Sequence, residues 1–88
     1  MTLEEQVKEV KRAIFGNTEH NDNGVIALYV EEVRAFLLDA GVSEAKLNSR
    51  EVLGALVIGT SDLWNYQAGG VKYSDYFYKR VNQLTRGA

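Results

Sequence analysis

The fold is decided by residues 25–41, which read VIALYVEEVRAFLLDAG. Apolar side chains recur there every three or four positions, which is the period of one face of an α-helix. These apolar residues are Ile26, Tyr29, Val30, Val33, Phe36, Leu37 and Ala40. Gly41 stands where a helix commonly ends, because glycine takes the left-handed conformation at low cost. The segment therefore predicts one long amphipathic helix from Val25 to Ala40.

A first helix is expected before this segment. Thr2 is followed three positions later by Glu5, which is the pattern of a capping box at a helix N-terminus. An apolar stripe then continues to Ile14, and the helix is expected to end near Gly16. Residues 16–24 are polar and rich in turn formers, so they predict a surface loop.

A third helix is expected after a short connection. The connection, residues 42–47, can hold one helical turn begun by Ser43. Asn48 or Ser49 can then cap the third helix, which reaches residues 64–66.

A fourth helix follows a second loop. Residues 67–73 contain two adjacent glycines, which supply positive φ in a turn. Ser74 can cap the last helix, whose apolar stripe is Phe77, Val81 and Leu84. No segment reads as a strand. The sequence therefore predicts one all-α domain, a small bundle of about four helices with two polar or Gly-rich loops.

Composition excludes several kinds of site. The 88 residues contain no cysteine and a single histidine, His20, so a disulfide, a thiolate nucleophile and a multi-His metal site are excluded. Gly69-Gly70 lacks the pattern of a phosphate-binding loop, and no cofactor is expected. No apolar run of 18 residues suggests a membrane span. We expect an intracellular protein without an enzymatic role, whose small core is supported by oligomerisation.

Charge is spread unevenly along the chain. The net charge is −2 and the pI is near 5.3, which argues against tight binding to the DNA backbone. The C-terminal end is nevertheless basic, with Lys72, Lys79, Arg80 and Arg86. The glutamate pairs earlier in the chain are expected on solvated faces, in ion pairs such as Glu4–Lys8 and Glu31–Arg34.

The third helix has an unusual face. Its core side is expected to carry Val52, Leu53, Leu56, Val57, Leu63 and Trp64. Opposite that side, Ile58 lies among small or polar residues, which are Gly54, Ala55, Ser61 and Asn65. Two interpretations remain open: either this helix is the buried centre of the bundle, or Gly54, Ile58 and Ser61 contact another subunit.

Aromatic residues gather near the C-terminal end of the chain. Trp64 and Phe77 are expected in the core, whereas Tyr76 and Tyr78 flank Phe77 on opposite sides and are candidates for partner contacts. Asp62 lies near the carboxyl end of the third helix, where the helix dipole disfavours a negative charge. We expect it to anchor the following loop through free amides or Lys72.

Both loops are expected to contact partners, because rigid helices commonly position recognition loops. The candidate residues are Asn17, His20 and Asp22 in the first loop, Gln67, Gly69, Gly70, Lys72 and Tyr73 in the second, and Tyr76, Tyr78 and Arg80 beside it.

The C-terminal half also resembles a known family. The relevant stretches are LGAL (53–56), DLWNY (62–66), GGVKYS (69–74), YF (76–77) and RVNQL (80–84). They look like the head–tail connector (adaptor) family of tailed bacteriophages, and residues 11–15 and 22–38 are similar to its opening helices. The resemblance implies a structural protein of the virion neck, assembled in the host cytoplasm. It also implies a homo-oligomeric ring, usually twelve-fold, beneath the portal protein and above the next tail or stopper component.

The resemblance further implies a central channel through which DNA passes without specific binding. Excess carboxylate in such a channel would let DNA move, whereas Lys and Arg would hold it. The competing hypothesis is a small helical DNA-binding or regulatory protein that uses the basic C-terminal end. A third hypothesis is an enzyme subunit or an accessory module.

Overall fold

The computed structural model describes residues 1–66 and 73–86, and all the regular structure in them is helical. Four helices have seven residues or more, α1 (Leu3–Phe15), α2 (Val25–Asp39), α4 (Leu53–Asn65) and α5 (Asp75–Arg86). A short helix α3 (Glu44–Leu47) and a 3-10 turn η1 (Arg50–Val52) lie between α2 and α4. The expected all-α class is confirmed.

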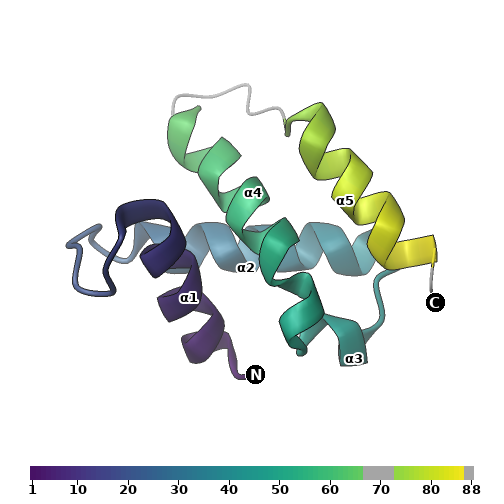
Figure 1. Cartoon of the computed structure of the whole chain (residues 1–88), viewed down its shortest axis with the longest axis horizontal. Coiled ribbons are helices and arrows are strands. Elements are labelled where there is room, and N and C mark those ends of the chain that lie inside the picture. Colours follow the sequence, from purple (N-terminus) through teal and green to yellow (C-terminus); the bar gives the residue numbers. More distant parts are fainter. Residues whose placement is uncertain (67–72, 87–88) are drawn as a thin grey trace.

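The helices form two layers (Figure 1). Helix α2 lies behind, and α1, α4 and α5 cross in front of it. Helix α4 is the centre of the bundle, because it packs against each of the other three long helices. The molecule is thin, measuring 18 Å along its shortest axis.

Local sequence signals set the helix boundaries. The capping box of Thr2 and Glu5 is formed in both directions, and Gly16 ends α1 with a φ of +81°. Ser43 accepts from the amide of Lys46 and begins α3. Ser49 caps the 3-10 turn rather than α4 itself, so the expected third helix is divided at Val52.

The core contains side chains from every helix. Its buried apolar residues are Val10, Ile26, Val30, Val33, Leu37, Val42, Leu47, Val52, Ala55, Leu56, Leu63, Phe77, Val81 and Leu84. Ala55 corrects the expected face of the third helix, because Ala55, Gly59 and Thr60 are buried and Gly59 lies against Val33 of α2. Leu53, Val57 and Trp64 are only partly buried.

Gly59 allows the two layers to come together. A Cβ on this residue would lie 2.7 Å from Phe77 Cε1 and 2.9 Å from Val33 Cγ1. Because Gly59 has no side chain, Phe77 and Val33 can pack directly against the backbone of α4. This close approach supports the first interpretation of the glycines in α4, a central helix packed from several sides.

A buried polar cluster joins α1, α2 and α3. Gln6 is fully buried, and its Nε2 donates to the carbonyl oxygen of Leu47 at 2.8 Å. Arg34 donates through Nη1 to Gln6 Oε1 at 2.6 Å and through Nη2 to Asn48 Oδ1 at 3.1 Å. The expected Glu31–Arg34 ion pair is wrong, because the guanidinium points into this cluster.

Candidate interaction surfaces

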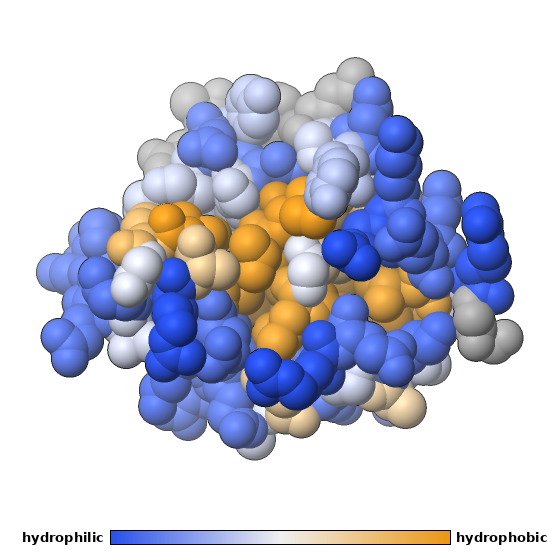
Figure 2. All heavy atoms as spheres, in the orientation of Figure 1, coloured by the Kyte–Doolittle hydropathy of each residue, from blue (hydrophilic) through white to orange (hydrophobic). Residues whose placement is uncertain are grey.

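The outward face of α4, which carries Gly54, Ile58 and Ser61, lies opposite the buried residues of that helix. All three are partly exposed. In this orientation α4 crosses the front of the molecule (Figure 1), and hydrophobic residues continue through the middle of that face between hydrophilic ones (Figure 2). The structure therefore leaves apolar surface accessible where the sequence suggested a subunit contact.

Arg80 of α5 reaches across to α4. Its guanidinium atoms lie 3.4 Å from the place where a Cβ of Gly54 would stand. Arg80 Nη1 also donates to Gln83 Oε1 at 3.3 Å. The close approach at Gly54 is thus made, at least in part, by a side chain of the same chain.

A small cleft lies along α5 beside Arg80. Its volume is about 170 Å³, and it is lined by Tyr76, Lys79, Arg80 and Gln83. Tyr76 is 63% exposed. The two cations and the amide can bind an acidic group of a partner, and the aromatic ring can pack against an apolar group beside it.

Tyr73 is more buried than its position beside a Gly-rich loop suggested, and it packs against the core. Its ring stacks on Phe77 with centroids 4.3 Å apart and lies 5.0 Å from Phe36. Burial, with a smaller contribution from the negative charge of Glu32, raises the pKa of Tyr73 to about 12. Tyr78 packs against the edge of the same cluster but remains exposed.

Asp62 finds its partner at the start of α5. Ser74 donates to Asp62 Oδ2 from both its amide and its hydroxyl group, each at 2.9 Å. The hydroxyl of Ser74 also accepts from the amide of Phe77 at 3.2 Å, so Ser74 caps α5. The carboxylate thereby lies near an N-terminal helix end, where the dipole favours it. The residues of the second loop that were expected at a partner contact, Gln67, Gly69, Gly70 and Lys72, lie outside the described residues.

Asp22, expected at a partner contact, is instead engaged by groups of its own chain. Its side chain is nearly buried; Oδ2 accepts from the amide of Ile26 at 2.9 Å and Oδ1 from that of Gly24 at 3.2 Å. Lys11 Nζ lies 3.7 Å from Oδ1. Burial raises the pKa of this carboxyl, but the two amides and Lys11 outweigh it and hold the pKa below its usual value. Asp22 therefore holds the turn that leads into α2, while Gly24 is the N-cap residue of the helix.

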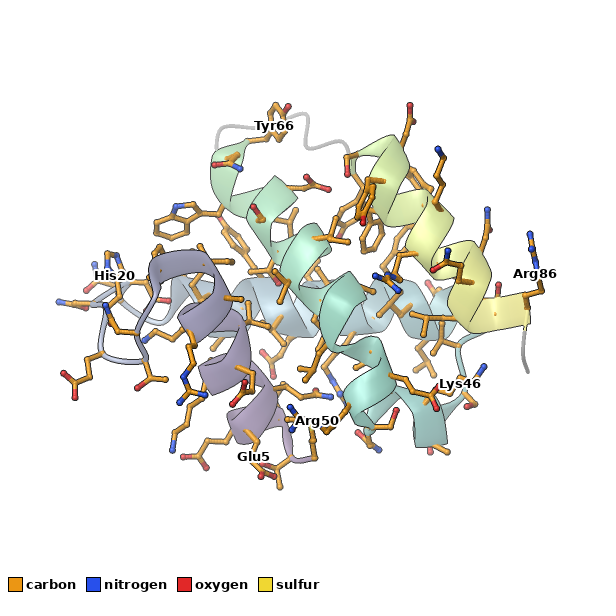
Figure 3. The ribbon with its side chains drawn as sticks, viewed as in Figure 1. Glu5, His20, Lys46, Arg50, Tyr66 and Arg86 are labelled. Atoms are coloured by element: carbon orange, nitrogen blue, oxygen red, sulfur yellow. The ribbon has the colours of Figure 1, made fainter. Side chains whose placement is uncertain are left out.

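The rest of the first loop is exposed. His20 stacks on Phe15 with centroids 3.8 Å apart and lies at the edge of the molecule (Figure 3). Asn17 accepts from the amide of Glu19 through its side chain and is exposed. These two residues remain available to a partner.

The outward face of α2 carries exposed leucines that were not among the expected contact residues. Leu28 is 64% exposed and Leu38 is 47% exposed. Both leucines lie within the expected long helix but outside its expected apolar face. The helical period of the sequence is therefore enough to place them on the exposed side.

Comparison of the chain with protein-family models, curated proteins and solved structures finds no match. Within the described residues, no three His, Asp or Glu side chains are grouped so that they could hold a metal ion. None of the described helices has the length and apolar character needed to span a membrane.

Proposed function

We propose that the chain is a structural subunit of the head–tail connector of a tailed bacteriophage. In this role it forms a homo-oligomeric ring in the virion neck, beneath the portal and above the next tail or stopper component. The resemblance of residues 53–84 supports this role, and its main physical support is the partly exposed apolar face of α4 at Ile58.

A subunit of an assembly contacts its neighbours through apolar surface that is exposed in the isolated chain. Five large hydrophobic side chains among the described residues are more than 40% exposed, namely Leu28, Leu38, Tyr66, Tyr76 and Tyr78. Tyrosine is enriched in protein interfaces, and a small core gains stability from neighbours. Asn17 and His20 would contact a neighbour, the portal or the next component. DNA would pass through the channel without specific binding.

The ring can be tested by measuring particle mass. The chain is mixed with the portal protein encoded in the same genome, and native mass spectrometry is recorded with and without the portal. We expect a closed ring, twelve-fold by resemblance, on the portal. A chain that remains monomeric in both samples, or a genome without a portal gene, would contradict the proposal.

Ile58→Glu tests the face of α4. Ile58 is partly exposed and packs at the edge of the core, so the monomer of this variant should keep its helical circular dichroism with a lowered melting temperature, while ring formation is lost. Ala45→Glu adds the same charge at an exposed position of α3 and serves as the control. Loss of helical signal in Ile58→Glu alone would place Ile58 in the core and remove it from the subunit contact.

The basic cleft on α5 favours a second candidate, a small DNA-binding or regulatory protein. Lys79, Arg80 and Arg86 would supply its phosphate contacts, while Lys72 lies outside the described residues. A gel shift with duplex DNA separates the two functions, because affinity that falls steeply with salt is expected of the DNA-binding protein alone.

A further inference from the structure

The outward face of α2 combines apolar and acidic side chains. We call it the acidic ridge; it consists of Leu28, Glu31, Glu32, Ala35, Leu38 and Asp39, and all six are exposed. They lie opposite the buried positions of the helix, Ile26, Val30, Val33 and Leu37. The ridge therefore faces away from the buried side of α2, with Glu32 at the flank nearest Tyr73.

The ridge carries three carboxylates and no cation of its own helix. The single basic residue of α2 is Arg34, and its guanidinium is engaged with Gln6 and Asn48 in the buried polar cluster. Negative charge beside two exposed leucines suits a partner that offers both cations and an apolar surface.

The opposite face of the molecule offers that combination. We call it the basic hollow, which consists of Ile58 on α4 and the cleft formed by Tyr76, Lys79, Arg80 and Gln83 on α5. Arg80 lies against Gly54, one helical turn before Ile58 on the same face of α4, so the cations and the apolar surface adjoin.

The two surfaces point in opposite directions. Helices α2 and α4 pack against each other through their buried sides, so their outward sides face away from one another. Figure 1 is viewed along the shortest axis of the molecule, with α4 in front of α2. One copy can thus present its ridge to the hollow of the next copy across a subunit only 18 Å thick.

We propose that the acidic ridge of one copy docks in the basic hollow of the next, in a repeated head-to-tail contact. Leu28 and Leu38 would cover the apolar surface around Ile58 and Tyr76. Glu31 and Glu32 would pair with Lys79 and Arg80. A contact between two different surfaces of identical chains forms a ring when the rotation closes. The inference rests on the proposed connector function, because it names the contact that builds the ring.

A second copy fits these surfaces better than a nucleic acid does. Phosphates would neutralise Lys79 and Arg80 but would leave the apolar surface of Ile58 uncovered. A nucleic acid bound in the hollow would also leave the two leucines of the acidic ridge, on the opposite face, in water.

Charge reversal on each surface tests the contact. The ridge variant is Glu31→Lys with Glu32→Lys, and the hollow variant is Lys79→Glu with Arg80→Glu. The control for the ridge variant, Glu4→Lys with Glu44→Lys, raises the net charge by the same amount at exposed carboxylates outside both surfaces. The control for the hollow variant, Lys8→Glu with Arg50→Glu, lowers it by the same amount at exposed cations outside both surfaces. Self-association is measured by sedimentation equilibrium, and folding by circular dichroism. If Arg80→Glu unfolds the chain, Lys79→Glu alone is used as the hollow variant.

Each reversed variant alone should associate at least about tenfold more weakly than the wild type and its control. An equimolar mixture of the two should recover association, because one partner keeps a wild-type hollow and the other a wild-type ridge. A mixture that stays monomeric, or variants that associate as well as the wild type, would overturn the inference. So would a wild-type chain that is monomeric at about 1 mM, a concentration that populates even weak contacts.

These outcomes are separate from those of the portal experiment. Head-to-tail association without binding to the portal would retain the contact and reject the connector function. Rings that form on the portal from either reversed variant alone would reject the contact and retain the function. Loss of duplex-DNA binding in the hollow variant, with no self-association of the wild type, would assign Lys79 and Arg80 to nucleic acid instead.

Discussion

Arg34 and Gln6 form the shortest side-chain contact of the buried polar cluster, with Nη1 of Arg34 donating to Oε1 of Gln6 at 2.6 Å. The contact joins α1 to α2 across 28 positions of sequence. Gln6 also donates to the carbonyl oxygen of Leu47, so a single amide side chain connects three helices. A buried amide is stabilising only while its partners remain, because an unpaired polar group loses its water without compensation.

Gln6→Leu should lower the free energy of unfolding by about 1–3 kcal/mol, since Arg34 loses an acceptor in a partly buried place. Arg34→Met should cost a similar amount, because Gln6 Oε1 is then unpaired. Urea denaturation of both variants and of the double variant measures the coupling. We expect the double variant to lose less than the sum of the two single changes. Additive losses would show that the two side chains act independently.

The two glycines of α4 should respond in opposite ways to alanine. Gly54→Ala should raise the free energy of unfolding by up to about 1 kcal/mol, because helix propensity improves and the flexible end of Arg80 can shift. Gly59→Ala should lower it by about 1–2 kcal/mol, because the new methyl group would overlap Phe77 and Val33 by more than the propensity gain offsets. Thermal denaturation of both variants gives the comparison, and equal shifts would contradict it.

Asp62→Ala should lower the free energy of unfolding by about 1–2 kcal/mol, because two donors of Ser74 lose their charged acceptor. Asp62→Asn keeps an acceptor oxygen and should cost less. Ser74→Ala removes the same hydroxyl contact together with the cap of α5, so it should be at least as severe as Asp62→Ala. An unchanged melting temperature for Asp62→Ala would show that the contact does not hold α5 against α4.

Asp22 should make the stability of the fold depend on pH in the acidic range. Its pKa is lower in the folded chain than the value of 3.8 usual for aspartate, so the folded state favours the ionised form. The corresponding stability is fully present above pH 3.8 and is lost as the pH falls through the lower folded-state pKa. Asp22→Asn should therefore be less stable at pH 7 and should lose less stability on acidification. Urea titrations at a series of pH values give the comparison, and identical pH profiles would contradict this role.

The helices could be predicted because their signals are local. The capping box of Thr2 and Glu5, the caps Ser43 and Ser74, and the stripe of Val25–Ala40 each depend on residues within one or two turns. The break at Val52 was missed, because a 3-10 turn and an α-helix share the same cap residues. The close packing at Gly59 could not be predicted from neighbouring residues in the sequence, since it depends on Phe77 and Val33 from other helices.

The candidate surfaces were harder to predict for the same reason. Asp22 and Tyr73 lie in polar or Gly-rich segments that suggest exposure. Asp22 instead accepts from an amide in the first turn of α2, and Tyr73 packs on Phe77. Asp62 was expected to need a partner because of the dipole of its own helix, yet Ser74 comes from the helix after the loop. The sequence therefore indicates which side chains need a hydrogen-bond or packing partner, but the identity of that partner depends on tertiary packing.

The single tryptophan of the chain provides an optical probe of its assembly. Trp64 is partly buried, and its ring meets the edge of Phe15 at the end of α1, with centroids 5.3 Å apart. Indole emission is sensitive to water, so a neighbour that covers this region should shift the spectrum to the blue, and release of α1 should shift it to the red. The wild-type protein can thus report binding at micromolar concentration without a label.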